Sequence, residues 1–220
     1  MQFIEKLATP GEHALFLEGL SGQLEAILTV PDQVRHTAVA FLGHPHSLQG
    51  GTMNNKVVTT MARVFKDLGI PSVRFNFRGV GQSAGTYSNG VGESDDMINL
   101  VNKWQKEQPD VKLFFAGFSF GSYVAYRTAA HFNHALLITI APPVHHYDYT
   151  EFNPAPHPWL IVQGDADEVV PCSLVFDFAQ HSSPVLPVIK FADTGHFFHG
   201  KLIELKTQLI EFINIQVPLL

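Results

Sequence analysis

Residues 114–122 of the chain read Phe-Phe-Ala-Gly-Phe-Ser-Phe-Gly-Ser. An apolar run typical of a buried strand continues here into the pattern G-x-S-x-G, and a helix is predicted to follow over residues 123–130. A serine on a sharp strand-to-helix turn needs very small residues two positions before and after it, because larger side chains would collide there. Gly117 and Gly121 meet that requirement. The segment therefore predicts a reactive Ser119, and the alternative is a serine that caps the helix of an ordinary loop.

Short, almost wholly apolar runs recur along the chain and alternate with stretches of helical period. Such runs are typical of strands covered on both faces, as in a parallel sheet flanked by helices. The runs lie at residues 37–42, 72–77, 112–118, 135–141, 159–162 and 185–191. Helical stripes end at Gly69, before Pro109 and near Phe212. The pattern predicts an α/β fold with a mainly parallel sheet and helices on both faces.

The first thirty residues have a different pattern. Residues 15–20 and 24–28 predict two antiparallel strands joined by a two-residue turn at Ser21-Gly22. The sheet is therefore expected to carry an antiparallel hairpin at one edge. Because the chain of 220 residues contains no repeat, linker or low-complexity tract, we predict one domain over residues 1–220.

Composition narrows the class of protein. The chain is 45% hydrophobic and only 15% charged, which is too apolar for a disordered protein. A net charge of −6 argues against nucleic-acid binding, and no apolar run reaches the ~18 residues that a membrane-spanning helix needs. The N-terminal sequence does not resemble a signal peptide, and a single cysteine, Cys172, fits a reducing compartment. We expect a cytoplasmic protein, monomeric or homodimeric, that binds neither nucleic acid nor membranes.

A reactive serine requires a histidine to accept its proton and an acid to orient that histidine. On a sheet of this type the chain order is serine, acid, histidine. The strand predicted at 159–162 opens into a loop with Asp165, Asp167 and Glu168, and the strand ending at 191 opens into a loop with His196. Three loops thus follow three strands in the required order.

Within those loops the choice of side chain depends on local geometry. Asp165 directly follows the strand, where it is expected to bond its own loop amides, so Asp167 is favoured as the acid and Glu168 comes third. Gly195 lets the backbone bend so that the next side chain reaches back over the sheet edge, which favours His196 over His199 as the base.

An oxyanion formed at Ser119 needs backbone donors. The turn directs the amide of Phe120 at such an oxygen, and a second amide is expected from the loop at residues 43–51 after the first parallel strand. Pro45 has no amide proton. We therefore predict the amide of His46, with Ser47 as the second choice. The alternative is that this glycine- and proline-rich loop is only a turn.

Two glycine patterns resemble nucleotide sites, but their surroundings do not fit. Residues 79–84 match G-x-G-x-x-A without a helix directly after the glycines, and we expect Arg78 to brace this loop through backbone carbonyls or through Glu93, Asp95 or Asp96. Residues 195–201 spell G-x-x-x-x-G-K, but Leu202 replaces the required serine or threonine. The histidine pairs at 44/46 and 145/146 lack metal-ligand spacing. No cofactor and no metal are predicted.

Together, residues 74–83, the Gly117–Gly121 pattern, residues 164–171 and residues 195–198 resemble the α/β-hydrolase superfamily. More narrowly, they are similar to small lidless bacterial serine hydrolases, a group related to dienelactone hydrolases and to serine aminopeptidase-like enzymes. The resemblance implies Ser119 as nucleophile, Asp167 as acid and His196 as base. It also implies an eight-stranded, mainly parallel sheet with an antiparallel second strand. Dienelactone hydrolases carry cysteine where this chain has Ser119.

The segment that holds a helical lid in many relatives is short here. Only residues 145–158 separate Val144 from the strand at Trp159, so no large lid is expected. Its aromatic residues Tyr147, Tyr149 and Phe152 are predicted to form a substrate wall, or alternatively to fill the edge of the sheet. The predicted function is acyl-enzyme hydrolysis of a carboxylic ester or thioester of a small molecule. The alternatives are an aminopeptidase-like amide hydrolase and a non-catalytic binding protein of the same fold.

Overall fold

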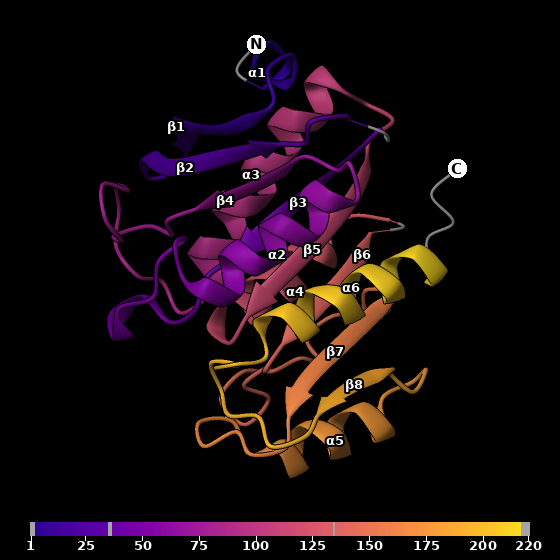
Figure 1. Cartoon of the computed structure of the whole chain (residues 1–220). Helices are drawn as coiled ribbons and strands as arrows, with labels where there is room; N and C mark the ends of the chain where they lie inside the picture. Colours follow the sequence, from indigo (N-terminus) through magenta and orange to yellow (C-terminus); the bar gives the residue numbers. More distant parts are fainter. Residues whose placement is uncertain (1–2, 35–36, 134, 217–220) are drawn as a thin grey trace.

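A computed structural model describes residues 3–34, 37–133 and 135–216. Its centre is one eight-stranded sheet in the order β1-β2-β4-β3-β5-β6-β7-β8 (Figure 1). The strands are β1 (Gly11–Gly19), β2 (Gly22–Val30), β3 (Ala38–Gly43), β4 (Ser72–Phe75), β5 (Lys112–Phe118), β6 (Leu136–Ile140), β7 (Trp159–Gly164) and β8 (Val188–Phe191).

Strands β3 to β8 pair in parallel, and β2 runs antiparallel to both β1 and β4. The predicted mainly parallel sheet with an antiparallel N-terminal hairpin is therefore confirmed. Three strands, β4, β6 and β8, are shorter than predicted. β8 begins only at Val188, because Pro187 has no N–H to donate. β4 ends at Phe75, and the Phe77 N–H donates to the His44 side chain instead of to a strand.

The hairpin turn lies one residue earlier than predicted. Gly19 pairs with Gly22, so Leu20 and Ser21 form the turn, and the prediction of Ser21-Gly22 was wrong by one position. The pairing of buried residues between β1 and β2 explains the position of the turn. Leu17 and Leu24 are opposite each other and both are buried, and moving the register by one residue would turn these leucines away from the core.

Helices cover both faces of the sheet, as predicted. Buried side chains of α3, α4 and α5 pack with one face, and those of α2 and α6 pack with the other. In Figure 1, α2 and α6 lie in front of the sheet. The helices are α1 (Ile4–Leu7), the 3-10 turn η1 (Ser47–Gln49), α2 (Lys56–Asp67), α3 (Val91–Glu107), α4 (Phe120–Ala129), α5 (Cys172–His181) and α6 (Leu202–Gln216).

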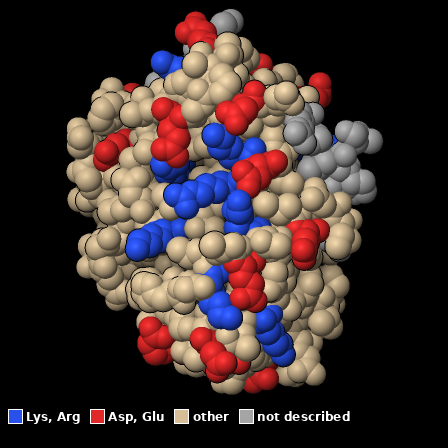
Figure 2. Space-filling view, in the orientation of Figure 1, with Lys and Arg blue, Asp and Glu red and all other residues tan. Residues whose placement is uncertain are grey.

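On the face that carries α2 and α6, basic and acidic side chains are interspersed (Figure 2). Lys206 of α6 pairs with Asp67 of α2 at 2.7 Å between Nζ and Oδ2. Lys66 pairs with Asp32 at 3.7 Å. Each such exposed pair contributes at most ~1 kcal/mol, so the attachment of α6 depends on its buried leucines, Leu205 and Leu209.

The segment between β6 and β7 forms no lid. Residues 141–158 are all described and contain neither helix nor strand, which confirms the expected absence of a large lid. Among the helices of the described chain, none combines the length and the apolar character needed to cross a membrane.

Candidate active site

Ser119 lies between the end of β5 and the start of α4, on a backbone that ordinary residues avoid. Its φ is 53° and its ψ is −123°. A Cβ atom on Gly117 would come within 2.0 Å of the Gly121 carbonyl oxygen, and one on Gly121 within 2.3 Å of the Gly43 carbonyl carbon. Because the Ser119 side chain makes no capping hydrogen bond, the alternative of a helix-capping serine does not describe it.

Three side chains from three loops meet at this turn. Ser119 Oγ is 3.1 Å from His196 Nε2, and His196 Nδ1 is 2.9 Å from Asp167 Oδ2. Ser119 follows β5, Asp167 follows β7 and His196 follows β8, so the carboxyl ends of the parallel strands bring them together. Asp167 accepts the Nδ1 proton, which leaves the unprotonated Nε2 facing the serine hydroxyl.

Asp167 is held in its ionised form by a set of donors. Burial of its side chain alone would raise the pKa, but hydrogen bonds from His196 and from the amides of Val170 and Val169 outweigh it, and the pKa lies below its ordinary value. Gln163 Nε2 donates a further hydrogen bond of 3.0 Å. The carboxylate therefore keeps both the charge and the position that orient the His196 imidazole.

The competing acids and the competing histidine lie elsewhere. The amide hydrogen bonds expected of Asp165 are made by Asp167, whose Oδ1 accepts from the amides of Val169 and Val170, so that expectation was wrong. Asp165 is exposed. Glu168 Oε2 accepts the backbone N–H of His196 at 3.2 Å and does not face the imidazole. His199 is exposed in the turn before α6.

Two amides are available beside the serine. Phe120 is the first residue of α4, so its N–H has no acceptor within the helix. His46 lies in the loop after β3, and in the described residues its amide donates to no protein group. Both residues line the pocket that contains Ser119, whereas Ser47 lines neither pocket at this site. The loop is pressed against the turn because Gly43 contacts Gly121.

His44 fixes the loop that carries His46. Its Nδ1–H donates to the Pro45 carbonyl at 2.7 Å, and its Nε2 accepts the Phe77 N–H at 2.9 Å. Its ring stacks on Phe77 with 4.0 Å between centroids. Both nitrogens are therefore occupied, and His44 is a structural residue joining two loops.

The burial of His44 should make stability depend on pH. Burial lowers its pKa from 6.5 to about 4, so between these values the unfolded chain binds a proton that the folded chain does not. The free energy of unfolding should therefore fall by about 3 kcal/mol as pH drops from 6.5 to 4, and level off below. Urea unfolding at several pH values measures this. His44→Gln, which does not titrate, should lose this contribution, and an equal slope in both proteins would refute the assignment.

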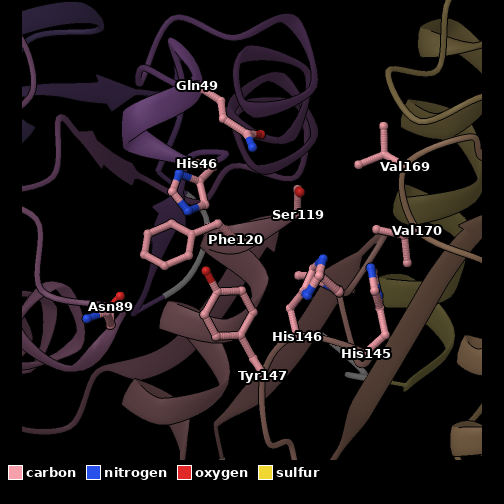
Figure 3. Close-up of a pocket in the computed structure, with 11 residues that line it drawn as sticks. His46, Gln49, Asn89, Ser119, Phe120, His145, His146, Tyr147, Val169 and Val170 are labelled. Atoms are coloured by element: carbon pink, nitrogen blue, oxygen red, sulfur yellow. The ribbon is translucent and has the colours of Figure 1, made fainter.

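A pocket of about 410 Å³ opens beside Ser119 (Figure 3). Two of its histidines, His145 and His146, belong to the segment between β6 and β7, and their rings lie 3.8 Å apart. The lining residues are His46, Gln49, Asn89, Ser119, Phe120, Pro143, His145, His146, Tyr147, Val169 and Val170. A smaller pocket of about 120 Å³ adjoins it and is lined by Ser119 together with His196, Asn55 and Phe197, among others.

Of the three aromatic residues predicted as a substrate wall, only Tyr147 lines the pocket beside Ser119. Tyr149 is 3% exposed, and its hydroxyl bonds to Ser122 Oγ at 2.7 Å. Phe152 packs on Tyr126 with 5.7 Å between ring centroids. Tyr149 and Phe152 line a different cavity, so their assignment to the substrate wall is corrected. Both pack on Tyr126 of α4, and Tyr149 also packs on Trp159 of the inner strand β7, so neither fills an edge of the sheet as the alternative had it.

Sequence reasoning missed several residues of the pocket. Gln49 and Asn89 carry no motif, and His145 and His146 were considered only as metal ligands. The course of the loops that present them depends on long-range contacts. One expectation for a neighbouring loop is confirmed: Arg78 Nε bonds Asp96 Oδ2 at 2.8 Å.

Comparison with known proteins places this fold in a family. A lidless α/β serine hydrolase from Xanthomonas campestris is 40% identical, with 96% of this chain and 97% of that chain covered and a TM-score of 0.90. An α/β serine hydrolase homologue from Coxiella burnetii is 41% identical, with 93% and 99% covered and a TM-score of 0.88. An uncharacterized protein from Rickettsia prowazekii is 34% identical over 214 residues, 90% of this chain and 87% of that protein.

No protein-family model matches the sequence. The identity to the two solved structures nevertheless extends over nearly the whole of each chain, and the Xanthomonas campestris hydrolase is, like this chain, without a lid. The chain belongs to the lidless α/β serine hydrolases.

Proposed function

We propose that the protein hydrolyses carboxylic esters or thioesters of small molecules through an acyl-enzyme formed on Ser119. The observation that carries the proposal is the continuous hydrogen-bond chain from Ser119 Oγ through the His196 imidazole to Asp167. A serine hydroxyl becomes nucleophilic near neutral pH only when such a base can take its proton. His196 is 3% exposed, so bulk water competes little for its nitrogen.

In the first half of the reaction, Ser119 Oγ attacks the carbonyl carbon and its proton passes to His196 Nε2. The carbonyl oxygen becomes an oxyanion, stabilised by the amides of Phe120 and His46. The intermediate collapses with cleavage of the bond to the leaving oxygen or sulfur, which receives the proton from His196. Water then attacks the acyl-enzyme by the same route and releases the acid. No step requires a metal or an organic cofactor.

The lining of the larger pocket favours this activity over that of an aminopeptidase. An aminopeptidase has to hold the protonated α-amino group of its substrate, for which a carboxylate is the natural partner. None of the described residues that line the pocket is Asp or Glu. The pocket is also open, because no lid covers it, and this suits short acyl groups better than long chains that need shielding from water.

The proposal is tested first by covalent labelling. A fluorophosphonate probe should add to the native protein, and mass spectrometry of the digested protein should place the adduct on Ser119. Ser119→Ala should take up no probe, whereas Ser173→Ala, which removes an exposed serine from α5, should be labelled fully. Absence of labelling in the native protein would favour the non-catalytic alternative.

The substrate class is tested by comparing leaving groups. Short p-nitrophenyl esters should be hydrolysed, and the matching acyl thioesters as well, while aminoacyl p-nitroanilides should be turned over far more slowly. Preferential cleavage of the anilides would instead support the aminopeptidase-like alternative.

A further inference from the structure

The two pockets at Ser119 differ in their access to the general acid. A leaving group must receive its proton from His196, so it has to lie on the side of the serine where that imidazole is exposed. The smaller pocket is lined by both Ser119 and His196, whereas the larger pocket is lined by Ser119 but not by His196. Given the proposed hydrolysis, the leaving group occupies the smaller pocket and the acyl group the larger.

The larger pocket is polar for an acyl site. Gln49, Asn89, Tyr147 and the paired histidines bring carboxamide, hydroxyl and imidazole groups to its wall. An unbranched hydrocarbon chain there would displace water from these groups without replacing its hydrogen bonds, which costs ~1–3 kcal/mol for each group left unpaired. In the described residues the lining also contains no lysine, arginine or carboxylate, so the pocket offers hydrogen bonds rather than fixed charge.

The protein also sets the direction of the hydrogen bonds made by His46, another residue of the pocket wall. The Leu48 N–H can only donate, and it donates to His46 Nδ1 at 3.2 Å. Burial lowers the pKa of His46, and the neutral imidazole then carries its proton on Nε2. That nitrogen is 3.2 Å from the Tyr87 hydroxyl, so Tyr87 is the acceptor in this hydrogen bond.

The Tyr87 hydroxyl in turn lies 3.4 Å from that of Tyr147. Tyr147 lines the pocket and Tyr87 does not, so of this pair only Tyr147 can donate to a substrate oxygen in the pocket, and Tyr87 then donates to Tyr147. Tyr147 has no other hydrogen-bond partner among the described residues. Its ring stacks on Tyr123 with 4.5 Å between centroids, and Figure 3 shows it between Phe120 and His146.

We infer that Tyr147 donates a hydrogen bond to an acceptor oxygen on the acyl group, so that the substrates are short esters with an ether, hydroxyl or carbonyl oxygen in the acyl chain. The hydrogen bonds from Leu48 to His46, from His46 to Tyr87 and from Tyr87 to Tyr147 hold the donor in place. The acyl pocket therefore selects oxygenated chains over hydrocarbon chains of equal length.

The test uses pairs of p-nitrophenyl esters that differ by one CH₂ replaced with oxygen: methoxyacetate against butanoate, and 3-methoxypropanoate against pentanoate. Each kcat/KM is divided by the rate of alkaline hydrolysis of the same ester. In at least one pair the native protein should prefer the oxygenated ester about tenfold, the equivalent of one hydrogen bond. Tyr147→Phe should abolish that preference, because kcat/KM for the oxygenated ester should fall about tenfold more than kcat/KM for the hydrocarbon ester.

Tyr126→Phe is the matched control. It removes the same atom from a tyrosine whose hydroxyl accepts the Phe152 N–H and which does not line the pocket, so the preference should persist. An equal loss on both esters in Tyr147→Phe, or a native preference for hydrocarbon in both pairs, would overturn the inference.

A third pair, 2-methoxyethyl acetate against butyl acetate, moves the oxygen to the leaving group. A Tyr147→Phe effect confined to this pair would reverse the assignment of the pockets and overturn the inference. The proposed function is judged separately, because Ser119 labelling and hydrolysis of the pentanoate ester do not depend on any preference for oxygen.

Discussion

The Ser119→Ala variant is expected to hydrolyse a short p-nitrophenyl ester with a kcat about 10⁴- to 10⁶-fold below that of the native protein. Without the hydroxyl no acyl-enzyme forms, and the amides of Phe120 and His46 can assist only direct attack by water. His196→Ala should cause a loss of similar size, because the hydroxyl would then keep its proton. Steady-state and single-turnover kinetics with p-nitrophenyl butanoate measure both variants.

The double variant, which carries both Ser119→Ala and His196→Ala, gives a stricter test. If Ser119 and His196 act as one unit, the double substitution should cost no more than either single one. Asp167→Asn should cost less, on the order of 10⁴-fold, because the serine and the imidazole remain but the orientation of the imidazole is lost. Losses that multiply in the double variant would show that the two side chains act independently and would contradict the acyl-enzyme mechanism.

Folding of these variants is checked by circular dichroism and by thermal unfolding. Among the described residues the Ser119 hydroxyl forms a hydrogen bond only with His196, so Ser119→Ala should keep the native midpoint of unfolding. A large drop in that midpoint would mean that the loss of activity has a structural origin.

The candidate residues of the site could be predicted from the sequence because they lie in local sequence patterns. G-x-S-x-G after an apolar run, and acidic and histidine loops after two later strands, have few structural solutions once the sheet is parallel. The approach of Ser119, Asp167 and His196 to hydrogen-bonding distance agrees with that prediction. The catalytic roles of these residues stay predictions until the kinetics are measured.

What could not be predicted depends on contacts between distant residues. Gly43 must be small because it lies against Gly121, and no residue near Gly43 in the sequence indicates that contact. Tyr147 and Tyr149 are two residues apart and alike in type, yet one lines the pocket and the other bonds Ser122 inside the protein. Their loop has no regular secondary structure, so no periodicity indicates which side chain faces in.

The second large effect is expected on folding. Gly117→Ala should lower the free energy of unfolding by about 3 kcal/mol or more, because the added methyl group would meet the Gly121 backbone at 2.0 Å and neither strand β5 nor helix α4 can move without disturbing the sheet. The φ of Gly117 is not positive, so its backbone would suit any residue and the cost is entirely one of space. Urea unfolding of the native and variant proteins measures the difference.

Gly200→Ala separates the two reasons for which a position requires glycine, namely a lack of space for a Cβ atom and a positive φ. Gly200 has a φ of +74°, and a Cβ there would meet no atom within 4 Å, so its substitution should cost only the backbone strain of about 1 kcal/mol. If Gly117→Ala cost no more than Gly200→Ala, β5 and α4 would be able to separate, and the close approach that sets the position of Ser119 would not be a rigid feature of the fold. A large difference would mean instead that the contact between Gly117 and Gly121, which excludes a methyl group, is rigid and fixes the strained backbone of Ser119 between them.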